Sequence, residues 1–472
     1  MAFLEANRYL YLTTPLGEDK LLLRGFEGEE AISKLFSFEL DLEAENTTTV
    51  DFDKLIGQKV SFGIEGADPG QTPRHFHGIV VELGQGARDQ RLTTYSMTVA
   101  PEIWKLSCII RSRIFQHITI PDLLKKLFTG FDVAYEIQGT FEQREYVVQY
   151  QESDLDFASR LMEEEGIYYF FKFTRGAHKL VLANTPQSHP DIPGGSQVIF
   201  DADEGALREE ERISSWTKEQ YWGSGKYTLW DHHFQLPHKK LDAEQLVMDS
   251  VQAGKIMHKL KLSGNEEMEV YENPGRYAQR FDGIDRTGGE KAADLQKIFN
   301  DNKRTTSIRM QQEETTSILI HGESNHWQMT PGHKFTLQRH FNADGQYVVT
   351  AVSHEASEGG FHSDGEKEEK EEDDDNDRED HYGNSFDCIP YALKFLPPRV
   401  TRRPLVSGPQ SALVVGPPGE EIFTDKYGRV KVQFHWDREG KNDADSSCWL
   451  RVATSWRGRS GARSTFRALG KK

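Results

Sequence analysis

The alternation of apolar and polar residues predicts that the first hundred residues form strands joined by turns. Apolar or alternating runs occupy residues 20–26, 35–42, 58–65 and 74–83. Asp68-Pro69-Gly70 stands between the last two runs and is typical of a turn. This pattern indicates antiparallel hairpins, as in a barrel or a sandwich.

The next segment has the period of an amphipathic helix. Thr119 is a capping residue, Leu123, Leu124 and Leu127 fall on one face, and Gly130 is a stop signal. We therefore predict a helix between Thr119 and Gly130.

A second predicted helix, residues 153–165, ends in three consecutive acids. Ser153 and Asp156 can form a capping box, an apolar stripe follows, and Gly166 ends the helix. The acids at 163–165 fall in the last turn, where the helix dipole disfavours each negative charge by ~0.3–1 kcal/mol. A basic neighbour elsewhere in the fold is the compensation that we expect.

Strand patterns return after this helix and again after residue 317. The predicted strands are residues 167–173, 179–183, 318–320, 334–338 and 346–353. Residues 216–222, 226–231 and 252–262 carry mixed strand and helix signals, and residues 290–300 predict a further helix.

Two distant segments share one short pattern. Residues 57–62, Gly-Gln-Lys-Val-Ser-Phe, match residues 332–337, Gly-His-Lys-Phe-Thr-Leu, and each segment precedes a glycine-bearing turn and another strand. An internal repeat of this kind predicts two copies of one barrel with the helical portion between them.

Beyond a connector rich in Pro and Arg, the C-terminal part has the pattern of a small barrel. Val430, Val432 and Phe434 alternate with Lys431 and His435, which predicts a strand with one face in a core. Several short strands at such spacing are typical of a closed barrel.

Charge and cysteine content narrow the function classes. The formal net charge is −18, which disfavours nucleic-acid binding because phosphate contacts need clustered Lys and Arg. Residues 364–380 hold 12 acidic and 3 basic residues, which predicts a solvated loop. The three cysteines are far apart, so we expect neither a disulfide framework nor a cysteine zinc site. We therefore expect the chain to be made in a reducing cytoplasm.

The sequence predicts neither a signal peptide nor a membrane span. Polar residues interrupt the apolar residues of positions 1–12, and no run reaches the ~18 apolar residues that cross a bilayer. If the protein is exported, we expect a route that does not require a signal peptide.

Residues 420–437 and 446–452 closely resemble the oligosaccharide/oligonucleotide-binding (OB) domain of the VgrG family, the spike proteins of type VI secretion systems. Residues 26–36, 55–57, 76–80 and 149–169 agree with the same family. The resemblance covers nearly the whole chain, up to about Ser455.

The resemblance implies a mainly β fold with α+β character, similar to contractile phage tail hubs. It implies a head at 1–363, with barrel 1 at about 1–110, an α/β portion at about 111–210 and barrel 2 at about 211–363. A linker at 364–404, an incomplete OB-fold barrel at 405–455 and an atypical basic tail at 456–472 complete the predicted organisation.

The resemblance also implies a structural role rather than an enzymatic one. The expected assembly is a homotrimer that caps a hexameric tube protein, with baseplate components around it and effectors or a tip protein in the complete form. Family members continue into a β-helix needle, which this sequence lacks, so we expect a truncated copy with weakened trimerisation. It would reach a target membrane only indirectly.

Candidate chemistry is sparse. The 17 histidines form no H-E-x-x-H motif, and there is neither a G-x-S-x-G motif nor a Walker loop, so we predict no metal, cofactor or catalytic residue. The predicted interaction residues are Lys431, His435, Trp436 and Arg451. The alternative is an OB-type module that binds nucleic acid or glycan through stacking and charge.

Overall fold

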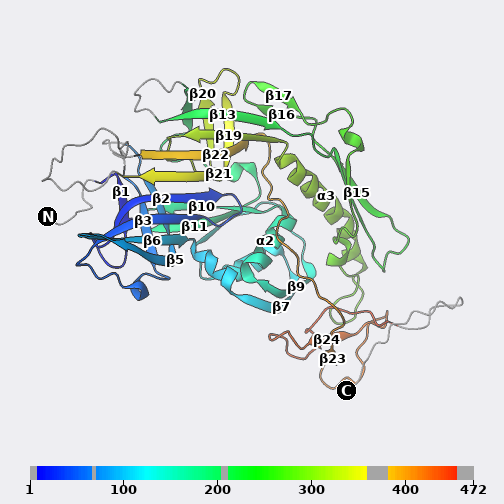
Figure 1. Cartoon of the computed structure of the whole chain (residues 1–472). Helices are drawn as coiled ribbons and strands as arrows, with labels where there is room; N and C mark the ends of the chain where they lie inside the picture. Colours follow the sequence, from blue (N-terminus) through cyan, green and yellow to red (C-terminus); the bar gives the residue numbers. More distant parts are fainter. Residues whose placement is uncertain (1–7, 66–70, 203–210, 359–380, 454–472) are drawn as a thin grey trace, which may run out of the picture.

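The structure, a computed structural model, describes residues 8–65, 71–202, 211–358 and 381–453 (Figure 1). Twelve strands form one hydrogen-bonded sheet in the order β1-β4-β5-β6-β3-β2-β21-β20-β12-β13-β19-β22. This sheet contains two barrel-like units, and the helices lie to one side of it. The predicted mainly β fold with α+β character is confirmed.

Barrel 1 is built from the first six strands, in the order β1-β4-β5-β6-β3-β2. Their bounds are β1 (Leu10–Thr13), β2 (Leu22–Ala31), β3 (Ser37–Glu45), β4 (Lys59–Ile64), β5 (Arg74–Arg88) and β6 (Leu92–Ala100). Alternate residues of β3 are buried, as its sequence pattern predicts. Phe26, Phe38, Phe62 and Phe76 fill the interior, with the rings of Phe38 and Phe76 4.5 Å apart.

Barrel 2 closes completely, because β21 pairs with β22 as well as with β20. Its strands are β12 (Gln197–Phe200), β13 (Arg212–Gln220), β19 (Ile318–Ser324), β20 (Lys334–Gln338), β21 (Gly345–Ser357) and β22 (His381–Pro390). Two predicted boundaries were wrong: β12 lies within the predicted α/β portion, and β22 lies within the predicted linker. The acidic run, which lies outside the described residues, separates β22 in sequence from the strands with which it pairs.

Five strands of the two barrels correspond in chain order, pairing and register. The bulge of the second strand falls at Arg24 in barrel 1 and at Ser214 in barrel 2. The bulge of the fifth strand falls at Val81 and at Thr350. The first strand differs, because β1 runs antiparallel to β4 whereas β12 runs parallel to β20.

The repeated sequence motif occupies the same place in both barrels. Gly57 and Gly332 have φ of 76° and 79°, a region that favours glycine. Their N–H groups donate to the carbonyls of Val80 and Val349 at 2.8 and 2.9 Å. The prediction of two related barrels is therefore confirmed at the level of single hydrogen bonds.

An antiparallel ladder joins the barrels. Residues 25–31 of β2 pair with residues 351–357 of β21, with Gly28 opposite His354. The two barrels consequently form one continuous layer, with one hydrophobic core centred on each.

The α/β portion follows barrel 1. It contains β7 (Ile110–Ile118), α1 (Ile120–Leu127), β8 (Val133–Glu136), β9 (Arg144–Ser153), α2 (Asp154–Glu165), β10 (Tyr168–Thr174) and β11 (Ala177–Ala183). Both helices begin at the predicted caps, since Thr119 and Ser153 accept hydrogen bonds from the backbone N–H groups of Asp122 and Asp156. Gly166 ends α2 in the left-handed conformation.

An insertion of residues 221–317 separates the second and third strands of barrel 2. It contains β14 (Lys226–Asp231), β15 (Leu241–Leu246), β16 (Ser250–Ala253), β17 (Ile256–Lys259), β18 (Glu269–Glu272) and α3 (Lys297–Thr315). The predicted helix at 290–300 was largely misplaced, because α3 runs to Thr315 without an apolar stripe. Short 3₁₀ helices lie at Phe52–Lys54, Glu102–Cys108, Pro186–Ser188, Asn265–Glu267, Ala278–Arg280 and Ala292–Gln296.

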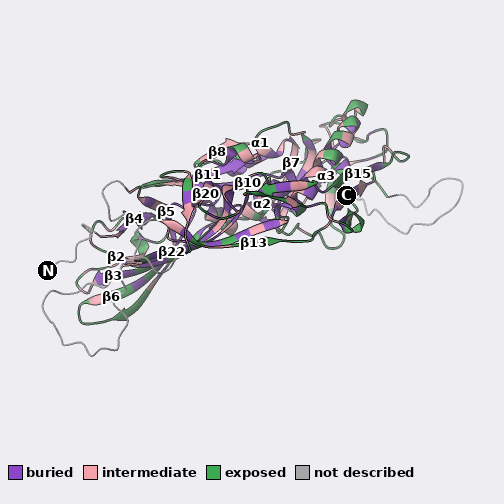
Figure 2. Cartoon of the chain, turned by 90° about the horizontal axis from the view of Figure 1, so that it is seen from above, coloured by how far each residue is buried: buried purple, intermediate pink, exposed green. Residues whose placement is uncertain are grey.

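The C-terminal part contributes one small antiparallel sheet. It consists of β23 (Ala412–Val415) and β24 (Lys431–Phe434), with a bridge between Val430 and Leu450. The described residues of this part do not close a barrel, so the incomplete OB domain stays a prediction. Seen from above, the molecule is elongated, with buried residues running through its centre (Figure 2).

The barrel layer leaves no room for a side chain at Gly28. A Cβ atom there would lie 1.9 Å from the ring of Phe38. We expect Gly28→Ala to lower the free energy of unfolding by ~1–3 kcal/mol, since overpacking forces the ring to move. Urea unfolding followed by fluorescence measures this loss. Gly176→Ala is the matched control, because nothing lies within 4 Å of its Cβ position. An equal loss in both variants would contradict the prediction.

Candidate functional site at the junction of head and C-terminal strands

The acidic end of α2 is buried against arginines from several segments. The Nη1 atom of Arg144, in β9, lies 2.7 Å from Glu164, and Arg144 also contacts Glu165. Arg304 of α3 contacts Glu165, and Arg403 of the connector lies 2.5 Å from Glu164. The basic neighbours expected from the sequence are thus present, and they come from outside the helix.

The remaining acid of this turn binds the connector. The hydroxyl of Thr401 donates to Glu163 at 2.6 Å, and the backbone N–H of Thr401 donates to the same carboxylate. Burial raises the pKa of Glu163, and the hydrogen bonds from Thr401 oppose that rise. The end of α2 therefore fixes the path of the connector toward the C-terminal strands.

Burial raises the pKa values of the other two carboxylates, Glu164 and Glu165, whereas neighbouring arginines lower them. Burial alone would raise the pKa of Glu165, but Arg144, Arg304 and Arg280 outweigh it and leave that pKa at about 2. Arg144 and Arg403 likewise hold the pKa of Glu164 far below its usual range against the effect of burial. Both carboxylates are ionised at neutral pH.

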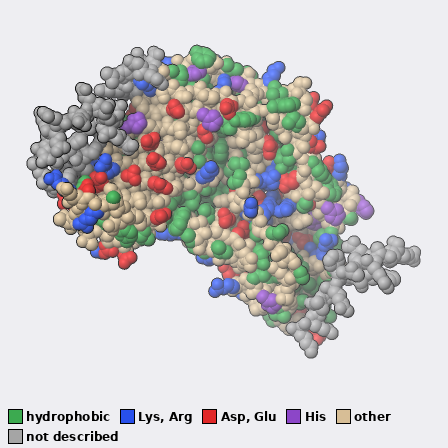
Figure 3. All heavy atoms as spheres, in the orientation of Figure 1, with side chains coloured by type: hydrophobic (Ala, Val, Ile, Leu, Met, Phe, Trp, Pro, Cys, Tyr) green, Lys and Arg blue, Asp and Glu red, His purple; other side chains and the backbone are tan. Residues whose placement is uncertain are grey.

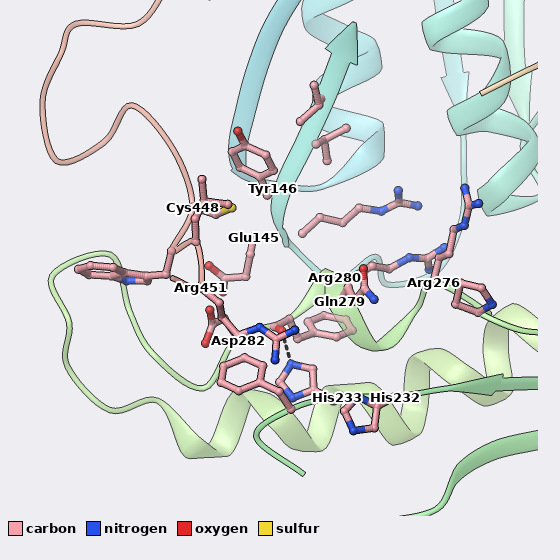
Figure 4. Close-up of a pocket in the computed structure, with 18 of the residues that line it drawn as sticks. Glu145, Tyr146, His232, His233, Arg276, Gln279, Arg280, Asp282, Cys448 and Arg451 are labelled. Atoms are coloured by element: carbon pink, nitrogen blue, oxygen red, sulfur yellow. Dashed lines mark hydrogen bonds between the residues drawn. The ribbon is translucent and has the colours of Figure 1, made fainter. Parts of the chain in front are cut away.

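A cavity of about 740 Å³ opens beside this cluster, between β9, the insertion and the C-terminal strands (Figure 4). Figure 4 shows Glu145 and Tyr146 on one wall, Arg276 and Arg280 on another, and Cys448 and Arg451 on the C-terminal segment. Seven arginines line it: Arg144, Arg160, Arg276, Arg280, Arg403, Arg429 and Arg451.

Acidic side chains neutralise most of these arginines from within the chain. Arg160 pairs with Glu152 at 2.7 Å, and Arg280 pairs with Asp301 at 2.7 Å. Arg429 binds Asp425 at 2.6 Å. On the face shown in Figure 3, basic side chains gather next to acidic ones beside α3. The cavity is thus a junction held together by ion pairs.

Burial shifts the pKa of two titratable groups in the cavity lining, Cys448 and His233, toward the uncharged form. Burial raises the pKa of the Cys448 thiol to about 12, so it is not a thiolate. Burial lowers the pKa of His233, whose Nε2 lies 3.2 Å from the carbonyl of Phe281 (Figure 4). Among the described residues, no group of three or more His, Cys, Asp or Glu is arranged to hold a metal ion.

The four predicted interaction residues lie at different places. Lys431 is buried, and its Nζ donates to the carbonyl of Ala444 at 2.5 Å. His435 is exposed. The prediction that Lys431 lies on a polar face was wrong, because Lys431, Val432 and Gln433 are all buried.

The other two predicted residues contact the head. Trp436 packs edge-on against Tyr150 of β9, with ring centroids 5.4 Å apart. Arg451 lies over the ring of Phe234 at 5.1 Å. The four side chains therefore do not form a single binding face, and only Arg451 lines the cavity. Their role as an interaction site stays a prediction.

A family model described as the phage tail baseplate hub (GPD) matches residues 29–360, which is most of the chain. The chain belongs to the phage tail baseplate hub family. This assignment agrees with the two related barrels and the intervening α/β portion.

The hub chain is also similar to type VI secretion spike proteins. It is 32% identical over 471 residues to the spike protein VgrG1b of Pseudomonas aeruginosa, covering 97% of this chain and 57% of the relative. It is 29% identical to the actin cross-linking toxin VgrG1 of Vibrio cholerae, covering 94% of this chain and 38% of the toxin. The chain thus spans little more than half of the first relative and less of the second.

Solved structures show the same fold. The E. coli c3393 protein, described as a type VI secretion component similar to the T4 tail proteins gp27 and gp5, superposes with a TM-score of 0.57 at 17% identity, covering 90% of this chain and 89% of that one. A chain of the half-lidded Francisella PdpA–VgrG complex gives a TM-score of 0.52 at 9% identity, covering 94% and 70%. The described helices include none long and apolar enough to cross a membrane.

Neutralising Glu165 tests the buried cluster. Its folded pKa of about 2 lies below the 4.5 of a free carboxyl, so its contribution to stability is present above pH 4.5 and is lost as the pH falls toward 2. We expect Glu165→Gln to lower the free energy of unfolding by about 3–5 kcal/mol at pH 7, because buried arginines lose their partner.

The difference between the native chain and Glu165→Gln should shrink between pH 4.5 and pH 2, as measured by chemical unfolding at each pH. Glu290→Gln is the control, since Glu290 pairs with Lys426 at an exposed site and such pairs contribute ~0–1 kcal/mol. A difference independent of pH would contradict the assignment of a depressed pKa to Glu165.

Proposed function

We propose that the chain is the hub portion of a type VI secretion spike and works as a homotrimer that caps the hexameric tube protein. In this role it transmits the force of sheath contraction and makes or breaks no bond. Baseplate components surround it, and effectors or a tip protein bind to the complete spike. The proposal rests on the family assignment and on the similarity to spike proteins.

The observation that carries the proposal is the repeat of the barrel. Each chain supplies two barrels with five corresponding strands, joined edge to edge by β2 and β21. Three such chains supply six similar barrels, which match the symmetry of a sixfold tube. Oligomers of this kind close when the rotation between neighbours completes a ring.

The surface chemistry supports a protein partner rather than nucleic acid. The exposed face of β2, β3 and β21 carries Glu27, Glu29, Glu39, Asp41 and Glu355, and acidic side chains are spread over this part of the surface in Figure 3. An acidic face repels a phosphate backbone. The proposed role also needs no cofactor, since carboxylates of the chain itself pair with most of the arginines that line the cavity.

The proposed location is the cytoplasm, with assembly into the secretion apparatus and export by sheath contraction. The actin cross-linking activity in the name of the Vibrio relative belongs to a protein of which this chain matches 38%. We propose that this chain has no enzymatic activity of its own.

Sedimentation equilibrium and electron microscopy test the proposal. We expect the purified chain to form trimers at micromolar concentration and to bind one end of tubes assembled from its cognate tube protein. Disassembled tube protein, which lacks the sixfold end, is the control and should bind weakly. A chain that stays monomeric at all concentrations and leaves tube ends bare would refute the proposed role.

A further inference from the structure

One wall of the arginine-lined cavity contains the edge of a strand. Five consecutive residues of β9, 144–148, line the cavity. Successive residues of a strand point to opposite faces, so a run of five lining residues places the edge of the strand, rather than one face, along the cavity. Among the described residues, β9 pairs with β7 alone.

The backbone groups on this edge are largely available. The carbonyl of Val148 accepts a hydrogen bond from Nη2 of Arg160 at 2.7 Å, outside the ladder with β7. In an antiparallel ladder the N–H and C=O groups of alternate residues point to the same edge. The groups of Tyr146 and Arg144 therefore point to the same side as that carbonyl, and no other strand of the described chain bonds to them.

An extended segment of the C-terminal part forms another wall. Residues 448–451 line the cavity consecutively, and Figure 4 shows Cys448 and Arg451 on this segment. Leu450 bonds through its backbone to Val430. The cavity volume of about 740 Å³ lies within the ~300–1,000 Å³ that is typical of ligand sites, so a short length of extended chain can enter.

Positive side chains outnumber negative ones in the lining. The cavity is lined by seven arginines and by three acids, Glu145, Glu164 and Asp282. The acids already contact basic groups of the chain: Glu145 lies 3.1 Å from His117, and Asp282 lies 2.6 Å from Arg429. An anionic group that enters the cavity therefore meets more cations than anions.

Two of the seven arginines make no ion pair with the described residues. Arg276 and Arg451 are exposed, and Figure 4 shows them on different walls. Burial lowers the pKa of Arg403, and repulsion from Arg276 adds to this decrease against the attraction of Glu164. A carboxylate bound beside Arg276 and Arg403 relieves that repulsion.

The β9 wall also lacks hydrogen-bond acceptors. Nε of Arg144 and the hydroxyl of Tyr146 are buried without a hydrogen-bond partner among the described residues, and both residues line the cavity. Leaving such groups unpaired is unfavourable. A ligand that brings carbonyl or carboxylate oxygens to this wall supplies what it lacks.

We propose that this cavity binds an acidic peptide segment of a partner protein, which adds as a strand to the free edge of β9 and places its carboxylates on Arg276 and Arg451. In strand addition, main-chain hydrogen bonds provide affinity and alternate side chains provide selectivity. Guanidinium groups bind carboxylates through paired hydrogen bonds. The site lies outside the barrels and does not depend on the proposed trimer or on tube binding.

Apolar residues in the lining favour a peptide over a small oxyanion. They come from β9, the insertion and the C-terminal segment: Val147, Val148, Phe234, Phe281, Trp449 and Leu450. A small oxyanion uses only the guanidinium groups, whereas a strand with alternating acidic and apolar side chains uses the arginines, the apolar residues and the strand edge together. Such a segment contacts all three walls and joins the C-terminal part to the head.

Fluorescence anisotropy with the full chain tests the site. The probe is a short labelled peptide of alternating Glu and Val residues. We expect saturable binding that weakens as the salt concentration rises, because salt screens charge attraction. A peptide of alternating Lys and Val residues has the same length and strand pattern, and it should bind at least tenfold more weakly. Equal binding of the two peptides would overturn the proposal.

Two variants test the named arginines. Arg276→Gln and Arg451→Gln should each weaken binding of the acidic probe at least fivefold. Because neither arginine pairs with a described carboxylate, the buried cluster stays intact and urea unfolding should be unchanged. Arg339→Gln is the matched control, since Arg339 is exposed and lies outside the cavity lining. Equal affinity of all three variants would contradict the assignment of these arginines to the site.

N-methylated probes separate strand addition from simple charge attraction. Methylation of alternate backbone nitrogens removes the N–H donors from one edge of the probe, and the other frame removes them from the opposite edge. One frame should abolish binding and the other should retain it. Equal results in both frames, or full displacement of the probe by millimolar inorganic phosphate, would replace the peptide site with an oxyanion site. The proposed spike role is tested separately by trimer formation and tube binding.

Discussion

The compensation of three buried acids at the end of α2 is the constraint on which the rest of the junction depends. Carboxylates at a helix C-terminus oppose the helix dipole, and burial adds a desolvation cost. The chain meets both costs at Glu164 and Glu165 with arginines from β9, from two separate parts of the insertion and from the connector. At Glu163 it meets them with hydrogen bonds from Thr401 of the connector. Each arginine is itself buried or half-buried, so neither partner is stable in this place without the other. Four segments distant in sequence are thereby held at one point.

A second feature of the fold follows from the barrel repeat: among the described residues, part of β13 and part of β5 pair with another strand on one side only. The two long additions to barrel 2 enter between strands: the insertion between β13 and β19, and the acidic run between β21 and β22. Among the described residues, neither addition supplies a strand that pairs with β13 beyond Ile213 or with β5 beyond Val80. Open edges are usually blocked in monomeric proteins because they invite association.

The sequence predicted local structure well where one segment contains its own signal. The caps at Thr119 and Ser153, the stop at Gly166 and the repeated motif at Gly57 and Gly332 all act within a few residues, and all are found in the structure. The three acids at the end of α2 predicted a basic neighbour. The sequence did not show which arginines provide it, because these come from segments distant along the chain.

The failures have physical causes as well. The helix α3 buries polar side chains such as Asp301, Thr305 and Arg309, so its buried face carries no apolar stripe. The strand β22 follows a run of acids, and that composition suggested a linker. The alternating pattern of the strand predicted that Lys431 faces solvent, because charged side chains usually lie on the solvent-exposed face of a strand. Its ammonium lies instead inside the C-terminal part, 5.0 Å from the centre of the Trp449 ring.

The burial of Lys431 changes how the C-terminal part should be understood. Three aromatic or basic side chains of this part, Trp449, Arg429 and Lys431, are engaged within the chain. Trp449 donates from Nε1 to the carbonyl of Asp285 at 2.7 Å, and Arg429 binds Asp282 of the insertion at 2.6 Å. These contacts connect the C-terminal strands to the insertion, whose helix α3 carries Arg304 to the acids of α2. In the proposed spike, a load on the C-terminal part would pass to the barrels along this path of buried ion pairs. A hub that transmits force needs such a rigid connection, whereas a module that binds nucleic acid needs the same side chains free.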